Sequence, residues 1–528
     1  MRAAAKVLAL ALLLALRPAC GGGGGGGGGT PGSGISFPAL PVLVSPVPPA
    51  GSTGGLAPVG TPGATTINVS GLTDSAVQGA LQAALNAGGG IVMTTGGGSR
   101  TVLLAGILNL PSDSGAPKTV ILDGSDQITL SGNLSTGILQ INDLAQLTVQ
   151  RMKFIDARAS GSGGAINGLA RARLVTVINC TFDNCQTTEA GPDIGGGALR
   201  IANGQETQIS GCTFNRCAGS NGGAVNSLGT QLTILNSTFT QNAAFGSGGG
   251  ADAGPSGQGG IGGAVYVDNV SNAASLSHQL TVTGCVFNAN VANDHAGALF
   301  GYMTEGTGSS TPINQCTFAG NVVAGGHGHS GAIYSQSDTL NVSNSTFNLN
   351  SAASDGGAIF CNNDTSTFTN CTFQGNTCGN LGGGIFTTAG NVSLLNVTLA
   401  QNAANNFAGG LFSTATTTTV QNCIFSANTA LGNAYAGDQV NVSFAGGANV
   451  QAPATGTGAK PASVLGTTMV ADALLGPFQN NGGPTFTIQP QAGSAAIDLA
   501  GVSGAPATDQ RGFPRTGTGP DAGACEGP

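Results

Sequence analysis

Three residues in the middle of the chain carry side chains of the kind that bind metal ions. His295, His329 and Asp355 each stand three places before the alanine of a recurring unit that reads Gly-Gly-Ala or a variant of it. If successive units stack as neighbouring strands of a sheet, these side chains form one column with a step of about 4.8 Å. Two imidazoles and a carboxylate at that spacing could share a divalent ion such as zinc. The sequence therefore predicts a candidate metal site, with Asp294 and His327 beside it.

The same column has a second interpretation, a solvated turn without a ligand. Other units of the repeat carry residues there that follow no polar rule, namely Ser162, Gly195, Asn221, Leu381 and Phe407. Insertions before the unit that follows His329 would also break the alignment. Both interpretations stay open from the sequence.

Cleavage of polysaccharide is the enzymatic chemistry to consider, because Gly326-His327-Gly328 resembles the Gly-His-Gly of polygalacturonases. A glycoside hydrolase needs paired carboxylates, but only Asp294 stands near this tripeptide. A lyase needs acidic calcium ligands and a basic residue that removes a proton, yet no Lys or Arg occurs between Arg216 and Lys460. The sequence favours a protein without enzymatic activity and without a cofactor, and a lyase or hydrolase acting on acidic polysaccharide is the alternative.

The chain has twelve cysteines, and six of them share one place in the repeat. Ser237, Ser345 and Val397 replace cysteine at that place in other units, which is typical of a small buried side chain, and we therefore expect free thiols in the core. Cys185 and Cys217 occupy a different place, and a disulfide between them is the alternative. The cysteines of the shared place, two residues before an aromatic residue, are Cys180, Cys212, Cys285, Cys316, Cys371 and Cys423.

The first twenty residues have the layout of a secretory signal peptide. Arg2 and Lys6 precede an apolar run from Val7 to Leu16, which is too short to span a bilayer. Cys20 follows, and then nine glycines that form a flexible tether. This arrangement resembles a bacterial lipoprotein and implies that Cys20 is lipidated, although Arg17 stands where that family usually has Leu. An ordinary cleaved signal is the alternative.

Charge limits the partners of the chain. The formal net charge is −8, charged residues make up only 7%, and no basic cluster is present. We therefore expect no nucleic-acid partner and no attraction to anionic lipid. Contact with a membrane is expected only through the lipid anchor, and a glycan or a surface matrix remains as a possible partner.

Two short units alternate along the chain and predict the architecture that positions these residues. One unit reads x-Cys/Ser-Thr-Phe-x-x-Asn, and the other is Gly-Gly-Ala followed by Ile, Leu or Val. Such a repeat, with short strands and no helical period, predicts one solenoid turn per unit. Phe and Cys should then face the core, Thr should face outward, and the Asn should form an interior ladder. The aromatic or leucine positions are Phe154, Phe182, Phe214, Phe239, Phe287, Phe318, Phe347, Phe373, Leu399 and Phe425.

One helix interrupts this strand-like sequence. From Thr73 to Ala87 the apolar residues Val77, Leu81, Ala84 and Leu85 recur with helical spacing. Thr73 or Asp74 can cap its start, and the glycines after Ala87 stop it. We expect this helix to cover the open end of the strand stack, where unpaired backbone would otherwise invite edge pairing.

The repeat units resemble the polymorphic outer-membrane protein repeat, which implies an all-β, right-handed parallel β-helix of the pectate-lyase-like type on a bacterial surface. The C-terminal region resembles the choice-of-anchor surface domain. The segments that carry this second resemblance are Asn481-Gly482-Gly483-Pro484-Thr485, Gly493-Ser494-Ala495-Ala496-Ile497-Asp498, Asp509-Gln510-Arg511-Gly512-Phe513-Pro514-Arg515 and Asp521-Ala522-Gly523-Ala524-Cys525-Glu526.

Together these observations predict a signal peptide at 1–20, a stalk rich in Gly and Pro at 21–64, a β-helix at 65–445 and a choice-of-anchor-like region at 446–528. We expect a secreted protein, held at the cell surface or outer membrane by its N-terminal lipid. There it would act as an adhesin-like or structural module that presents a face rich in Ser, Thr and Asn.

Overall fold

The computed structural model describes most of the compact unit Phe37–Pro528. The expected signal peptide and Cys20 lie outside the described residues, and so do parts of the expected stalk. The described residues are 39, 42–44, 54–112, 118–142, 144–169, 172–247, 259–269, 279–303, 309–336, 339–362, 365–431, 439–441, 444–452, 468–499, 504–516 and 519–528.

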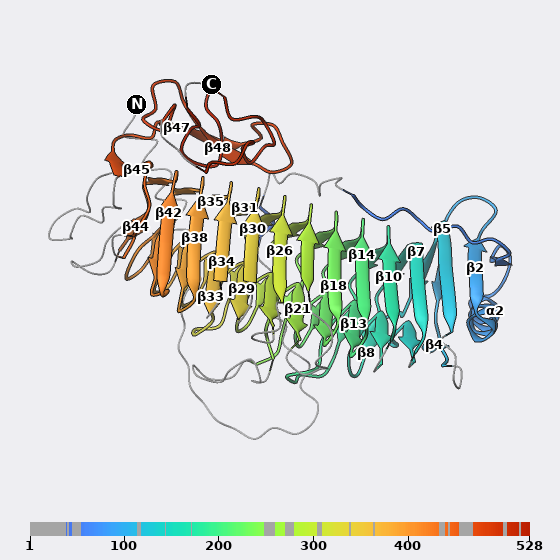
Figure 1. Ribbon diagram of the computed structural model, residues 1–528. Helices are drawn as coiled ribbons and strands as arrows, with labels where there is room; N and C mark the ends of the chain where they lie inside the picture. The colour runs from blue at the N-terminus through green and yellow to red at the C-terminus, as the bar shows by residue number, and fades with distance from the viewer. Residues whose placement is uncertain are drawn as a thin grey trace, which may run out of the picture. The chain divides into compact units, whose positions relative to one another are not determined.

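The described chain forms a right-handed parallel β-helix, as the sequence predicts, and its strands stack side by side from α2 to the C-terminal coils (Figure 1). The largest of its three parallel sheets, called the first sheet, has 25 strands. These strands are β1 (Thr65–Asn68), β2 (Gly89–Thr94), β3 (Arg100–Leu103), β5 (Thr119–Ser131), β7 (Gln146–Ile155), β10 (Leu174–Ile178), β11 (Thr181–Asp183), β14 (Glu206–Ser210), β15 (Thr213–Asn215), β18 (Gln231–Leu235), β19 (Thr238–Thr240), β22 (Leu280–Thr283), β23 (Val286–Asn288), β26 (Ser310–Asn314), β27 (Thr317–Ala319), β30 (Thr339–Ser343), β31 (Thr346–Asn348), β34 (Thr365–Thr369), β35 (Thr372–Gln374), β38 (Asn391–Leu395), β39 (Thr398–Ala400), β42 (Thr417–Gln421), β43 (Ile424–Ser426), β45 (Asn449–Ala452) and β46 (Thr468–Val470).

Two further parallel sheets complete each coil. The second sheet has 11 strands, which are β4 (Leu108–Leu110), β6 (Leu139–Ile141), β9 (Ile166–Gly168), β13 (Leu199–Ala202), β17 (Val225–Leu228), β21 (Val265–Asp268), β25 (Leu299–Tyr302), β29 (Ile333–Gln336), β33 (Ile359–Asn362), β37 (Ile385–Thr387) and β41 (Leu411–Ser413). The third sheet has 10 strands, which are β8 (Arg158–Ala159), β12 (Gln186–Thr187), β16 (Ala218–Gly219), β20 (Ala243–Ala244), β24 (Val291–Ala292), β28 (Val322–Val323), β32 (Ser351–Ala352), β36 (Thr377–Cys378), β40 (Ala403–Ala404) and β44 (Thr429–Ala430).

The predicted stacks of identical side chains fill the interior. The phenylalanines from Phe154 to Phe373 form one column, whose neighbouring ring centroids lie 4.7–5.0 Å apart. Leu399 and Phe425 continue it in register. Each coil thus repeats the side chain of the previous coil at the interstrand spacing, which buries a continuous apolar core.

A second interior column consists of asparagine side chains. The amide nitrogen of each one donates to the side-chain oxygen of the next, at 2.8–2.9 Å. Asn350, for example, is fully buried and also donates to the carbonyl oxygen of Phe318 at 3.0 Å. The ladder therefore satisfies polar groups that no water reaches. It comprises Asn242, Asn290, Asn321, Asn350, Asn376, Asn402 and Asn428.

The paired glycines lie at the bend that leads into the second sheet. Gly196 has a φ of 68°, a backbone conformation that glycine adopts without strain. A Cβ on the next residue, Gly197, would lie 2.5 Å from the backbone of Ala218. The first glycine therefore supplies a positive φ, and the second permits close backbone contact.

The eleven described cysteines are buried and form no disulfide, including Cys185 and Cys217. The thiol column is thus part of the core, and the described part of the chain contains no disulfide between that pair. Burial raises the pKa of Cys212, Cys371 and Cys423 to about 12. These thiols therefore stay protonated at neutral pH and are poor nucleophiles.

The predicted helix is α2 (Asp74–Ala87). The Thr73 side chain accepts a hydrogen bond from the Ala76 backbone N–H at 3.2 Å, and Gly88, with a φ of 81°, ends the helix. The buried side chains of α2 join the main core, and α2 contacts β1, β3 and β4. The helix therefore covers the N-terminal end of the solenoid, as expected.

The first sheet continues past residue 445 through β45 and β46, beyond the boundary expected for the β-helix. After it come β47 (Leu475–Gln479) and β48 (Thr487–Pro490), an antiparallel pair.

The C-terminal region packs on the outward threonines of the first sheet. Thr346 donates to the carbonyl oxygen of Phe486 at 2.6 Å, Thr372 donates to the side chain of Gln510 at 2.7 Å, and Thr398 accepts from the backbone of Ala524 at 3.0 Å. These threonines are fully buried as a result.

Part of the segment expected to be a stalk also lies against the first sheet. The backbone of Val44 exchanges two hydrogen bonds of 3.1 Å with the side chain of Asn288, and Leu56 donates to Ser210 at 2.8 Å. The backbone of Val59 pairs in the same way with Gln150. Segments near both ends of the unit thus use outward side chains of the first sheet.

Asn350→Ala should lower the free energy of unfolding by about 3 kcal/mol. The change leaves the amide of Asn321 and the carbonyl of Phe318 buried without their partner, and each such group costs about 1–3 kcal/mol. Urea unfolding followed by circular dichroism measures the change. Asn406→Ala is the control, because Asn406 is exposed and its side chain donates to that of Asn380. The effect of this change should stay within about 0.5 kcal/mol. Equal effects of the two changes would contradict the role of the ladder.

Candidate functional site

One row of outward side chains runs along the second sheet in strict register. It begins with Asn109 on β4 and Gln140 on β6. It continues with Asn167 on β9, Arg200 on β13 and Asn226 on β17. From β21 onward the same position is aromatic in each strand, as Tyr266, Phe300, Tyr334, Phe360, Phe386 and Phe412. The outer face of this sheet therefore has a polar half and an aromatic half.

The aromatic half is a continuous stack. Neighbouring ring centroids lie 4.8–5.3 Å apart from Tyr266 to Phe412. Most of these rings are covered, since Tyr266 is 1% exposed and Phe386 is 7% exposed. Ile261 and Ala296, from the preceding bends, join them in a second apolar cluster. The stack thus works mainly as packing outside the solenoid, rather than as an open platform.

The predicted column of His295, His329 and Asp355 lies beside this stack. The two imidazole rings stack with centroids 5.2 Å apart, and His295 also stacks on Tyr334 at 5.1 Å. His329 Nδ1 lies 3.1 Å from a carboxylate oxygen of Asp355. The structure therefore brings the three residues together, as the alignment of the repeat units predicts. His327 is exposed and forms no part of these contacts.

The ring nitrogens that face this column already have neighbours. His295 Nδ1 accepts a hydrogen bond from the backbone of His329 at 3.1 Å. Asp355 accepts from the side chain of Asn380 at 2.7 Å and from the backbone of Leu381 at 3.0 Å. Burial lowers the pKa of His295 to about 3, with the imidazole of His329 as the second cause. The His295 imidazole is therefore neutral, as a metal ligand must be.

Within the described ranges, no group of three or more His, Cys, Asp or Glu side chains has an arrangement that could hold a metal ion. The zinc site at His295, His329 and Asp355 therefore stays a prediction. The stacked rings and their hydrogen bonds agree equally with a packed outer turn.

Arg200, in the polar half of the row, lines a recess of about 220 Å³. Asp193 and Asp268 bring carboxylates to it, and Arg200 brings a guanidinium group. The hydroxyl of Tyr266 donates to Asp268 at 3.2 Å. Burial lowers the pKa of Arg200, although Asp193 partly opposes that shift. The residues that line the recess are Asp193, Arg200, Ala202, Asn203, Leu228 and Asp268.

The first sheet carries a different surface, which we call the hydroxyl–amide patch. It consists of two parallel columns of side chains on β30, β34, β38 and β42. These four strands lie side by side in Figure 1. None of its members is charged, and all are at least partly exposed. Thr367 donates to Asn341 at 2.7 Å, which links the coils along one column. The patch consists of Thr339, Asn341, Thr365, Thr367, Asn391, Ser393, Thr417 and Thr419.

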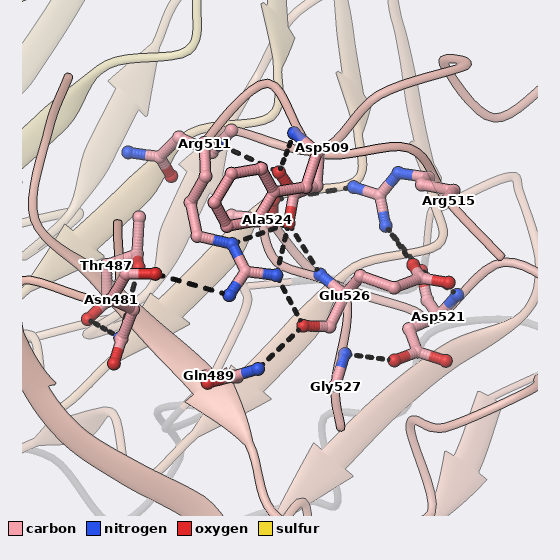
Figure 2. A network of polar contacts seen from close by, with 12 residues as sticks. Asn481, Thr487, Gln489, Asp509, Arg511, Arg515, Asp521, Ala524, Glu526 and Gly527 are labelled. Atoms are coloured by element: carbon pink, nitrogen blue, oxygen red, sulfur yellow. Dashed lines mark hydrogen bonds and ion pairs between the residues drawn. The ribbon is translucent and has the colours of Figure 1, made fainter. Parts of the chain in front are cut away.

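Buried charges cluster in the C-terminal region (Figure 2). The fully buried Asp509 carboxylate accepts from Arg511 Nε at 2.7 Å and from the backbone of Glu526 at 3.0 Å. Arg515 lies 3.2 Å from a carboxylate oxygen of Glu526, and Asp521 accepts from the backbone of Asp498 at 2.7 Å. Buried charges mark candidate sites, but here each charged side chain is hydrogen-bonded within the network. The network therefore holds together irregular loops, and it accounts for the motif residues without a ligand.

The recess is the feature that sequence reasoning missed. Arg200 and Asp268 lie 68 residues apart (268 − 200) but only two strands apart in the second sheet. The available signal was the position after each Gly-Gly-Ala-(Ile/Leu/Val) unit, because the residue that follows points outward and changes from polar to aromatic at Tyr266.

Comparison with models of protein families gives no match, and a search of curated proteins finds none. No helix among the described residues is long and apolar enough to cross a membrane.

Zinc titration tests the metal site. If His295, His329 and Asp355 bind zinc, isothermal titration of the wild type should release heat above background, and the double variant His295→Ala/His329→Ala should not. His327→Ala is the matched control, because this exposed histidine lies outside the column and its loss should leave the heat unchanged. No heat from the wild type ends the zinc hypothesis.

Proposed function

We propose that this chain is an exported β-helix protein, held at a bacterial surface by a lipid on Cys20, which acts there as an adhesin-like or structural module. The solenoid is a filled core rather than a container, so a partner must be recognised on its outside. The resemblance of the repeat units to polymorphic outer-membrane proteins, and of the C-terminal region to choice-of-anchor domains, supports the same surface role.

The hydroxyl–amide patch is the observation that carries this proposal. Hydroxyl and amide groups both donate and accept hydrogen bonds, so the patch suits a partner with many hydroxyl groups, such as a glycan or a surface matrix. Parallel coils repeat the groups at about 4.8 Å, which allows many weak contacts along an extended partner. Because the patch is uncharged, attraction between unlike charges contributes little to its binding.

Cleavage of polysaccharide is the second candidate function. The observation that favours it is the recess in which Asp193 and Asp268 meet Arg200. A glycoside hydrolase uses two carboxylates of this kind. The C-terminal network does not favour it, because its carboxylates are engaged with arginines and backbone groups.

Replacing Thr365, Thr367 and Thr419 together by valine should weaken binding to a glycan or matrix array by about tenfold or more. Each lost hydrogen bond is worth about 1 kcal/mol, and a tenfold change corresponds to about 1.4 kcal/mol. Valine keeps the shape and strand propensity of threonine. The measurement is binding of purified wild type and variant to arrayed glycans and matrix proteins.

Thr213→Val is the control for this experiment, because Thr213 is exposed on β15 outside the patch. Equal binding by the triple variant would contradict the role of the patch. An assay for reducing sugars and unsaturated products on the same glycans separates the second candidate. Steady product release that Asp268→Asn abolishes would replace the adhesin-like function with an enzymatic one.

Cys20→Ala should move the protein from the membrane fraction to the soluble fraction, because the acyl chains are its proposed anchor. Fractionation of cells that express the full chain, followed by immunoblotting, measures the shift. Ser33→Ala, in the same N-terminal segment, keeps Cys20 and should leave the protein in the membrane fraction. Membrane retention of the Cys20 variant would contradict lipidation.

A further inference from the structure

The polar half of the second sheet contains buried groups that the fold leaves without partners. Asn226 is 0% exposed, yet neither its amide nitrogen nor its oxygen has a hydrogen-bond partner in the described part of the chain. Arg200 Nε and Asn167 Oδ1 are buried in the same way. These three residues occupy consecutive strands of one outward row.

Stability does not explain these polar residues. A buried donor or acceptor without a partner costs about 1–3 kcal/mol. The same position holds a stacked aromatic side chain in the strands from β21 to β41, so an apolar residue suits the fold there. Polar residues that cost stability at one end of a regular row are therefore better explained by binding than by folding.

Of these three residues, Arg200 lines the recess described above. This recess has the size and chemistry of a small binding site. Its volume of about 220 Å³ is below the range of about 300–1,000 Å³ typical of sites for larger ligands, and it suits a ligand of about one ring. Arg200 can only donate hydrogen bonds, whereas the carboxylates of Asp193 and Asp268 can only accept them. Leu228 adds an apolar surface to the same recess.

Charge selects the class of ligand. Two carboxylates and one guanidinium group give the recess a net formal charge of −1, so an anionic ligand is repelled. Neighbouring sugar hydroxyls both donate and accept hydrogen bonds. They therefore match a recess lined by the donor Arg200 and by the acceptor carboxylates of Asp193 and Asp268. The hydrogen bond from Tyr266 holds the Asp268 carboxylate in position.

We propose that this recess binds one unit of an uncharged saccharide, with Arg200 donating to one hydroxyl and Asp268 accepting from its neighbour. The recess lies on the second sheet, whereas the hydroxyl–amide patch lies on the first. This inference therefore goes beyond the adhesin-like function carried by the patch, and either proposal can fail without the other. It shares the recess with the second candidate function, cleavage, from which the assay for reducing sugars and unsaturated products separates it.

Saturation-transfer NMR with the full chain tests the inference, using glucose, galactose, mannose and N-acetylglucosamine at millimolar concentrations as probes, and galacturonate as the anionic comparison. At least one uncharged sugar should bind, and galacturonate should bind more weakly than galactose. Arg200→Met and Asp268→Asn should each lower the affinity for the sugar by about tenfold, because each removes one charge-assisted hydrogen bond.

Arg216→Met is the matched control, because Arg216 is an exposed arginine paired with Asp183 on the first sheet; it should leave sugar binding unchanged. Asp268→Asn keeps the size of the side chain, so it remains informative if Arg200→Met does not fold. No saturation transfer to any uncharged sugar, binding unaffected by both recess variants, or tighter binding of galacturonate would each overturn the inference. The triple valine variant of the patch should bind these sugars as the wild type does, which separates this test from that of the proposed function.

Discussion

The interior asparagine ladder is the interaction on which the rest of this structure depends. Apolar stacking alone tolerates displacement, because a phenylalanine column gains similar area at neighbouring offsets. An asparagine amide that donates to the next amide at 2.9 Å and to a fixed carbonyl at 3.0 Å does not tolerate displacement, because both hydrogen bonds would be lost. A slip of one residue would also turn every buried side chain outward. The ladder therefore sets a single register for the coils from β19 to β43.

That register orders the outside of the solenoid as strictly as the inside. Because stacking constrains the inner positions, the repeat units of this chain differ mainly at their outer positions. There the first sheet carries, on β31, β35 and β39, threonines that the C-terminal region covers. On β30, β34, β38 and β42 it carries the hydroxyl–amide patch. The second sheet changes from polar to aromatic at Tyr266. Surfaces of different chemistry thus lie on one regular scaffold, which is how a repetitive fold acquires sites.

The core could be predicted from the sequence because its signals recur. The phenylalanine and asparagine positions and the helix capped by Thr73 each follow a local rule, and the structure confirms them. Aligning the units also placed His295 beside His329, but spacing could not say which ring nitrogens face a ligand. The docking of Gln510 on Thr346 and Thr372 was out of reach, because these contacts join residues more than 130 positions apart and no repeat encodes them. The recess was missed for a similar reason, since long insertions separate its residues in the sequence.

A crystal structure of the chain tests the central claim most directly, namely that the interior ladder fixes the outer surface. The account predicts an unbroken column from Asn242 to Asn428, with successive amides within hydrogen-bonding distance. It also predicts that Thr339, Thr365, Asn391 and Thr417 form one straight outer column beside it. The account would be contradicted if the asparagine column were intact but those outer residues were shifted by one residue between neighbouring coils.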